Sequence, residues 1–281
     1  MSIKRFAAGV AGVFAVLCAG SASADHDWNN YHWAKNNQGL VQPPVGVNLS
    51  GSWLGYVDTV ITDWNKSAVI DSARVAGSTA PKTCKPVAGT IQLCNATYGR
   101  TGWLGIAQIW LSNGHISQAV TKLNDTYYNT AQYNTAAWRR LVFCQEVGHN
   151  YGLGHTNEIF TNYNDGTCMD YTNAPAGGTV GGFNYGPSNE YPNQHDYDML
   201  AQIYGHADAT NFAVRSVTNP QGNRAVSEEA GGDTPAQWGR PTRFLESGRP
   251  FVFEQDLGGG RKKITHVFWL PDSNRHDHHE H

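Results

Sequence analysis

The 281-residue chain predicts an α+β fold, made of one large domain and a small β-rich C-terminal extension. Three observations lead to this prediction. An apolar stripe at helical spacing runs through Trp53 to Val75, two β-prone segments lie between Ile106 and Lys122, and a second helix is indicated from about Thr135 to Tyr151. No internal repeat stands out, so we expect a globular domain rather than a repeat array.

The apolar spacing and the turn residues support each element. The first helix carries one buried stripe, formed by Val57, Val60, Ile61, Trp64 and Ala68. The strands Ile106 to Leu111 and His115 to Lys122 are joined by a turn at Ser112-Asn113-Gly114. Gly152 ends the second helix, and a last helix is expected from Gln194 to Tyr204, with Asn193 as its cap and Gly205 as its stop.

The N-terminus has the features of a secretory signal peptide over residues 1–24. Lys4 and Arg5 precede an apolar run from Phe6 to Ala19, and Ala22-Ser23-Ala24 forms a small-residue cleavage site. A membrane anchor needs about 20 apolar residues, more than this run supplies. We therefore predict a secreted or periplasmic protein. The formal net charge of −3 and the absence of a long basic run argue against nucleic acid as a partner.

Four cysteines remain after removal of the signal peptide: Cys84, Cys94, Cys144 and Cys168. An even number in an oxidising compartment predicts two disulfides. We favour Cys84–Cys94, which closes a short loop. A zinc–thiolate cluster is the competing interpretation, although no close C-x-x-C pair supports it.

The last part of the chain, residues 211–281, predicts a linker, a small β appendage and a tail. Asn219 to Arg240 is rich in turn formers, and β-prone runs follow at Phe251 to Phe253 and Ile264 to Leu270. The tail from Arg275 to His281 is His-rich, which is compatible with loose metal binding or with a solvated end.

The segment that carries the chemistry runs from Cys144 to His155, with the sequence Cys-Gln-Glu-Val-Gly-His-Asn-Tyr-Gly-Leu-Gly-His. Gln145 and His149 lie one helical turn apart, and Glu146 lies beside them, where it can hold a water molecule near a metal. Gly152 can adopt a left-handed conformation, which would turn the chain so that His155 returns to the same metal.

This segment resembles the zinc-binding motif of the metzincin metallopeptidases, H-E-x-x-H-x-x-G-x-x-H, with Gln145 in place of the first histidine. The likeness covers roughly Trp28 to His206 and is closest to the matrixin-like members. Cys168-Met169-Asp170-Tyr171 resembles the Met-turn of that family, and Ile116 to Asp125 resembles its substrate-binding edge strand. The resemblance implies a twisted mixed sheet with an antiparallel edge strand, an active-site helix, a Met-turn and a C-terminal helix in residues 25–210.

The resemblance also implies roles for individual residues. Met169 would underlie the metal site, and Tyr171 would reach the metal or the oxyanion of the reaction. Cys144 and Cys168 would form a disulfide, because the active-site helix and the Met-turn approach each other in this fold. Gln145, His149 and His155 are the candidate ligands for Zn²⁺, and Glu146 is the candidate general base.

The function implied is a secreted zinc-dependent endopeptidase that binds a protein or peptide substrate as an extended strand and works as a monomer. Gln145 leaves three possibilities open: it ligates zinc through its side-chain oxygen, another histidine completes the triad, or the site is degenerate. We interpret His195 as a capping or surface residue, and His26 and His32 as surface residues. The alternative function is a catalytically inactive exported protein that binds metal or peptide.

Overall fold

The computed structural model describes residues 26–206 and 231–271. The predicted signal peptide, most of the predicted linker and the His-rich tail lie outside these residues. In the described residues, no helix is both long and apolar enough to cross a membrane.

One mixed sheet forms the scaffold, which confirms the predicted α+β class. Its strand order is β3-β2-β4-β6-β5-β11-β10-β9, and β1 pairs with the beginning of β6. The sheet strands are β1 (His32–Trp33), β2 (Val45–Asn48), β3 (Arg74–Ala76), β4 (Ile91–Ala96), β5 (Trp103–Ser112), β6 (His115–Asn124), β9 (Arg240–Phe244), β10 (Pro250–Gly258) and β11 (Arg261–Trp269). Pairing is parallel from β3 to β6 and antiparallel from β6 to β9.

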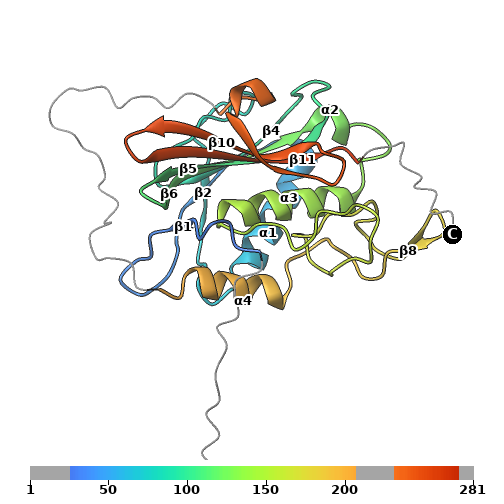
Figure 1. Ribbon diagram of the computed structural model, residues 1–281, viewed down its shortest axis with the longest axis horizontal. Coiled ribbons are helices and arrows are strands. Elements are labelled where there is room, and N and C mark those ends of the chain that lie inside the picture. Colours follow the sequence, from blue (N-terminus) through green and yellow to red (C-terminus); the bar gives the residue numbers. More distant parts are fainter. Residues whose placement is uncertain (1–25, 207–230, 272–281) are drawn as a thin grey trace, which may run out of the picture.

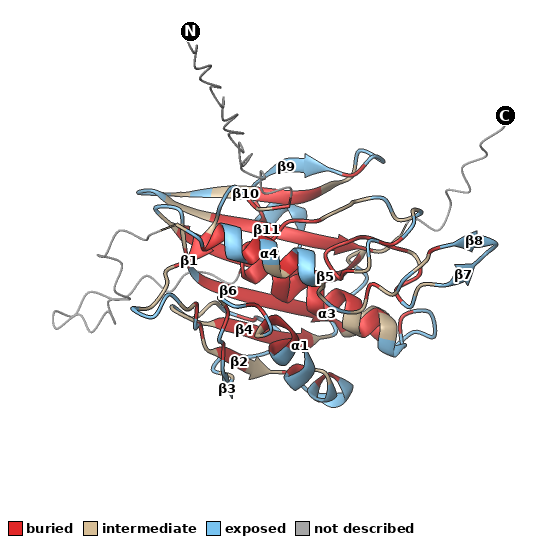
Figure 2. Ribbon diagram, turned by 90° about the horizontal axis from the view of Figure 1, so that it is seen from below, coloured by how far each residue is buried: buried red, intermediate tan, exposed pale blue. Residues whose placement is uncertain are grey.

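The three longest helices lie on one face of this sheet (Figure 1). The helical segments are η1 (Gly51–Gly55), α1 (Val57–Trp64), α2 (Asp125–Tyr128), α3 (Ala136–Asn150), α4 (Gln194–Ile203) and η2 (Pro235–Gln237). α3 packs against β5, β6 and β11 and contacts α1 on its other side. A small separate hairpin is formed by β7 (Thr179–Val180) and β8 (Phe183–Asn184). Figure 2 shows that α3 and the central strands are buried, so the side chains of this helix face the interior.

The predicted helices are present, with one change in length. The first begins at Val57 instead of Trp53, which lies in η1, and ends at Trp64 instead of Val75. Asn65 exchanges hydrogen bonds with the main chain of Ser72 and turns the chain toward β3. α3 begins after Thr135, whose hydroxyl accepts from the amide of Trp138. α4 has the predicted Asn193 cap, completed by Asp196 in a capping box.

The predicted edge strand, Ile116 to Asp125, is wrong in its position. It corresponds to β6, which lies inside the sheet between β4 and β5. The turn at Asn113-Gly114, with both residues at positive φ, directs β6 back along β5, where it also pairs with β4. β5 is likewise an inner strand, because it pairs with β6 on one side and with β11 on the other.

The expected small β appendage is instead part of the main sheet. β11 pairs with β5 from Arg261 opposite Ser112 to Trp269 opposite Trp103. The side chains of Trp238, Phe251 and Phe268 share one hydrophobic core with the first half of the chain. The described residues of the C-terminal part therefore belong to the same domain.

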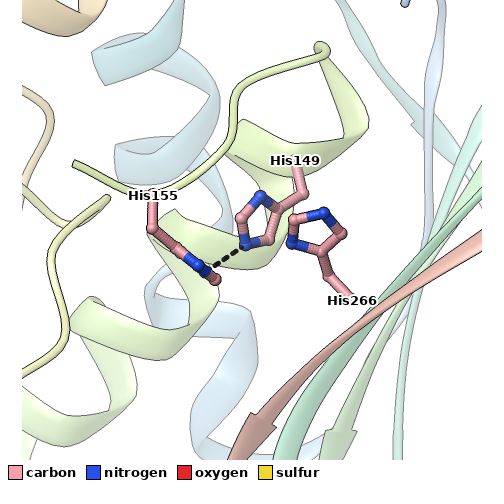
Figure 3. A group of neighbouring side chains, drawn as sticks. All are labelled: His149, His155 and His266. Atoms are coloured by element: carbon pink, nitrogen blue, oxygen red, sulfur yellow. Dashed lines mark hydrogen bonds between the residues drawn. The ribbon is translucent and has the colours of Figure 1, made fainter. Parts of the chain in front are cut away.

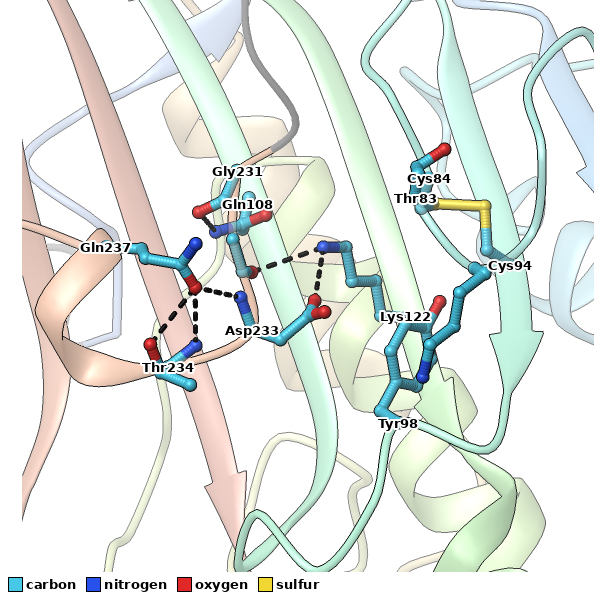
Figure 4. A network of polar contacts seen from close by, with 12 residues as sticks. Thr83, Cys84, Cys94, Tyr98, Gln108, Lys122, Gly231, Asp233, Thr234 and Gln237 are labelled. Carbon is cyan, nitrogen blue, oxygen red and sulfur yellow. Dashed lines mark hydrogen bonds and ion pairs between the residues drawn. A yellow bond between two sulfur atoms is a disulfide. The ribbon is translucent and has the colours of Figure 1, made fainter.

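The segment from Gly231 to Gln237 anchors this C-terminal part over buried polar groups (Figure 4). The ammonium group of Lys122 donates to the carboxylate of Asp233 at 2.8 Å and to the Gly232 carbonyl at 3.2 Å. Burial lowers the pKa of Lys122, and the charge of Asp233 opposes this shift. Gln108 donates to the Gly231 carbonyl and to the hydroxyl of Thr265, which ties the segment to both β5 and β11.

Candidate metal centre

The end of α3 positions the first two histidines. His149 lies in the last turn of the helix, and Gly152 follows at φ +97°, the left-handed conformation predicted for it. A Cβ at Gly152 would collide with the carbonyl oxygen of Tyr31. The chain therefore turns sharply after the helix and brings His155 back toward His149.

The N-terminal segment holds this turn in place. The amide of Trp28 donates to the Gly152 carbonyl at 3.1 Å, and the amide of Gly154 donates to the His26 carbonyl at 2.7 Å. The indole ring of Trp28 lies against the ring of His266, with centroids 3.5 Å apart. The loop that carries His155 is thus paired with the N-terminal segment, and the ring of Trp28 lies against the histidines His149 and His266.

Three buried histidines converge on one point: His149, His155 and His266 (Figure 3). Each offers a ring nitrogen within 4.8 Å of those of the other two. The Nε2 atoms of His149 and His155 are 2.9 Å apart, and the ring centroids of His149 and His266 are 3.9 Å apart. Among the described residues, neither ring nitrogen of His266 has a hydrogen-bond partner.

This arrangement fits a divalent cation such as zinc. The Nδ1 atom of His149 is 2.7 Å from the Leu153 carbonyl oxygen, so a neutral ring donates there and leaves Nε2 free to ligate. Nδ1 of His155 is 3.8 Å from the carboxylate of Glu158. Burial lowers the pKa of His266, His149 and His155, which keeps the rings in the neutral, metal-binding form. The donor set matches that of a three-histidine zinc site.

Glu146 lies one turn before His149, against the sheet. Its Oε1 atom is close to Gly105 of β5, where a Cβ would approach it to 2.6 Å. Burial raises the pKa of Glu146 well above its ordinary value. The amides of Phe268 and Ala107 lower that pKa in part, although neither completes a hydrogen bond of normal geometry with the carboxylate. A carboxylate whose pKa is raised by burial is a stronger base than one in water, which suits a role as a general base.

Gln145 is not in the histidine cluster. Its amide nitrogen donates to the Cys168 carbonyl at 2.8 Å, so the side chain joins the helix to the Met169 turn. His266 is the third member instead, as one of the possibilities left open by the sequence allows. Sequence reasoning missed this residue, because its strand was assigned to an appendage. The available signal was a histidine within an apolar β-prone run, Ile264 to Leu270.

The residues predicted to support the site are buried. The structure contains both predicted disulfides, Cys84–Cys94 and Cys144–Cys168. Met169 is fully buried, and its sulfur lies below Gly148 of α3. The hydroxyl of Tyr171 donates to the Val267 carbonyl of β11 at 3.2 Å, and burial raises the pKa of Tyr171 well above its ordinary value. Tyr171 therefore remains a hydrogen-bond donor.

Two other histidines have a burial that differs from the expectation. His26 and His32 are buried, with 2% and 7% exposure, rather than on the surface. His26 packs on His195 and lies 3.3 Å from Asp196, where the N-terminal segment crosses α4, and His32 lies beside His206. His195 is exposed, as we expected for a residue at the start of the helix.

Gly148→Ala is expected to lower the free energy of unfolding by about 1–2 kcal/mol. A Cβ there would approach Met169 Sδ to 2.5 Å and a ring carbon of Trp64 to 2.7 Å. Overpacking costs about 1–3 kcal/mol, and the better helix propensity of alanine returns up to about 1 kcal/mol. Urea unfolding measures the difference. Gly55→Ala, where a Cβ meets no heavy atom within 4 Å, is the control and should have little effect.

Asp170→Asn is expected to stabilise the protein at neutral pH and to remove part of its pH dependence. Burial raises the pKa of Asp170 to about 7, above its value of about 4 in an unfolded chain. The folded state therefore binds this proton more tightly, and stability falls by up to about 4 kcal/mol as pH rises from about 4 to 7. The amide can still accept from Asp165 and Asn189. Equal pH profiles of unfolding for the two proteins would contradict this assignment.

No protein-family model and no curated protein matches the chain. Among solved structures, it is similar to high choriolytic enzyme 1, a hatching-enzyme zinc protease from the medaka fish Oryzias latipes. That match has 14% identity and a TM-score of 0.35, and covers 63% of this chain and 95% of the other. A second match, to myroilysin, has 13% identity and a TM-score of 0.37, and covers 65% and 100%. These values are too low to carry an assignment of activity.

Proposed function

We propose that the protein is an exported zinc-dependent endopeptidase of metzincin-like architecture, in which His149, His155 and His266 hold the metal. The observation that carries the proposal is the buried three-histidine cluster one helical turn from a buried carboxylate, Glu146. The segment from Glu146 to His155, with its metzincin-like spacing, supports the same function. Two disulfides are compatible with an oxidising compartment.

The side chains divide the chemistry of peptide hydrolysis between them. A bound zinc ion would polarise the scissile carbonyl and acidify a water molecule. Glu146, beside the histidine cluster, would accept the proton of the attacking water and pass it to the leaving amine. The hydroxyl of Tyr171, which already donates to a main-chain carbonyl, stabilises the negative charge that develops on the substrate oxygen. Neutral His149 and His155 keep their ligating nitrogens unprotonated.

Substrate access requires the site to open. Glu146, His149, His155 and His266 are at most 5% exposed, and β11 lies across them. The same burial favours the alternative function, an exported protein whose closed metal site only stabilises the fold. The two functions differ in whether any form of the protein hydrolyses a peptide bond.

Removal and return of the metal tests the proposal. We expect one zinc ion per chain at the three-histidine site, and loss of both zinc and peptidase activity on chelation. Activity should return with stoichiometric zinc. The assay uses casein and a peptide library, with the chain intact and with the chain cut at a protease site inserted in the Gly258–Gly260 turn, where Gly258 and Gly259 have open space. If both forms bind zinc and neither hydrolyses a peptide, the result supports the alternative function, a metal site that only stabilises the fold.

A further inference from the structure

A second group of metal-binding side chains lies apart from the three-histidine cluster, where the N-terminal segment crosses α4. It consists of His26, His195 and Asp196, each offering one ligand atom within 4.8 Å of those of the other two. In residues 26–206 and 231–271, only this group and the three-histidine cluster bring three imidazole, thiolate or carboxylate side chains so close together. Two imidazoles and one carboxylate are a donor set that zinc and similar divalent cations accept.

The carboxylate of Asp196 is held so that one oxygen faces this group. Its Oδ2 atom accepts from the hydroxyl of Thr167 at 2.5 Å and from the amide of Asn193 at 2.7 Å. Its Oδ1 atom is buried and accepts no hydrogen bond of normal geometry from the described residues. This second oxygen lies 3.3 Å from Nε2 of His26. Such an oxygen is satisfied either by an ion pair with a protonated imidazole or by a cation that both groups bind.

The spacing within the group fits the ligands of one ion. Bonds of about 2.0–2.1 Å at a tetrahedral angle place two ligand atoms about 3.3 Å apart. Nε2 of His26 and Oδ1 of Asp196 already have this separation, and both side chains are buried. The ring of His195 stacks on that of His26, with centroids 4.8 Å apart, and brings a third donor from the exposed side. An ion pair would use His26 alone, whereas a bound cation uses all three side chains.

A cation at this point would join two parts of the chain that are far apart in the sequence. His26 belongs to the N-terminal segment, and His195 and Asp196 belong to the first turn of α4. The carbonyl of His26 accepts from the amide of Gly154 at 2.7 Å, so this residue also holds the turn that precedes His155. Fixing the side chain of His26 would therefore restrict local opening of this turn.

We propose that His26, His195 and Asp196 form a second binding site for a divalent cation with the ligand preference of zinc, which clamps the N-terminal segment onto α4. The inference goes beyond the peptidase function and does not depend on it. Exposure of His195 opens the site to water, and the N-terminal end of α4 carries partial positive charge that disfavours a cation. The second site should therefore bind zinc at least about tenfold more weakly than the three-histidine site.

Zinc titration of the full chain tests the proposal. A His-rich tail can bind metal by itself, so every protein carries alanine in place of the four tail histidines, His276, His278, His279 and His281. We expect two zinc ions per chain. His195→Ala should bind the second ion at least about tenfold more weakly and the first ion with unchanged affinity, because this exposed side chain is not part of the core. Competition with chelators of graded affinity measures both dissociation constants.

Two controls and one structural readout make the test specific. Asp198→Asn changes an exposed carboxylate of the same helix outside the group, and this variant should bind both ions normally. His266→Ala weakens the first site and should keep the second ion. Hydrogen exchange of the Gly154 amide, which donates to His26, should slow at least about threefold when the second ion binds to the parent protein. The same zinc concentration should leave this exchange unchanged in His195→Ala.

Three results would overturn the inference. Absence of a second ion at zinc concentrations up to about 1 mM would mean that His26 and Asp196 form an ion pair only. Equal affinity of the second ion for His195→Ala and for the parent protein would place that ion elsewhere on the surface, as adventitious binding. Unchanged exchange of the Gly154 amide in the protein with both ions bound would exclude the clamp.

Discussion

Replacing His266 with alanine is expected to lower the affinity of the intact chain for zinc by about 100-fold or more, equivalent to about 3 kcal/mol. His266 supplies one of the three converging imidazoles, and its two ring nitrogens have no other partner among the described residues. Loss of a ligand leaves the ion with two protein donors, an incomplete set for zinc. Competition with a chromophoric chelator measures the affinity.

Gln145→Ala is the matched comparison for the third ligand. The Gln145 amide donates to the Cys168 carbonyl, so its removal should change stability by about 1 kcal/mol and zinc affinity by less than about threefold. A large loss of zinc from Gln145→Ala, together with normal binding by His266→Ala, would make glutamine the ligand and contradict the assignment.

Glu146→Gln is expected to lower kcat/KM of the zinc-loaded protein by a factor of about 1,000 or more and to leave zinc bound. The amide has the shape of the carboxylate but cannot take a proton from water or return one to the leaving amine. General base catalysis contributes about 100- to 10,000-fold, and loss of the negative charge beside the metal adds to this. Initial rates with a quenched peptide, compared at equal zinc content, give the result.

Glu158→Gln is the control for Glu146→Gln, because Glu158 lies beside the candidate ligand His155 and has no assigned role in catalysis. Glu158 is partly exposed, and its carboxylate lies 3.8 Å from His155 Nδ1. The variant should therefore bind zinc about 10-fold more weakly, and its kcat should change little once zinc is saturating. Hydrolysis by zinc-loaded Glu146→Gln at the wild-type rate would exclude Glu146 as the base.

Local chemistry made much of the fold predictable. Helix spacing, the Asn193 cap and the turn at Asn113-Gly114 each depend on residues that are neighbours in the chain, and each is present. The same is true of Gly152, whose left-handed conformation follows from the lack of a Cβ. The candidate ligands His149 and His155 were predictable for this reason, because the end of the helix and the turn at Gly152 together relate them.

Pairing between distant strands was not predictable in the same way. The pattern of β6 indicates a strand but not its neighbours, and nothing local states that it lies between β4 and β5. His266 was missed because its role depends on the register of β11 on β5, which places it opposite Ala107. A one-residue slip would present Thr265 or Val267 to the site instead.

The long sequence distance between His155 and His266 also sets the order in which the protein can assemble. Closing a loop over such a distance costs conformational entropy, so we expect the arrival of His266 to be a late step of folding. A partly folded chain in which β11 has not yet joined the sheet would therefore hold only two of the three histidines of the candidate site. Full metal loading and closure of the site by β11 become possible together, once the C-terminal strand has joined the sheet, so that the metal centre is completed in the same event that covers it.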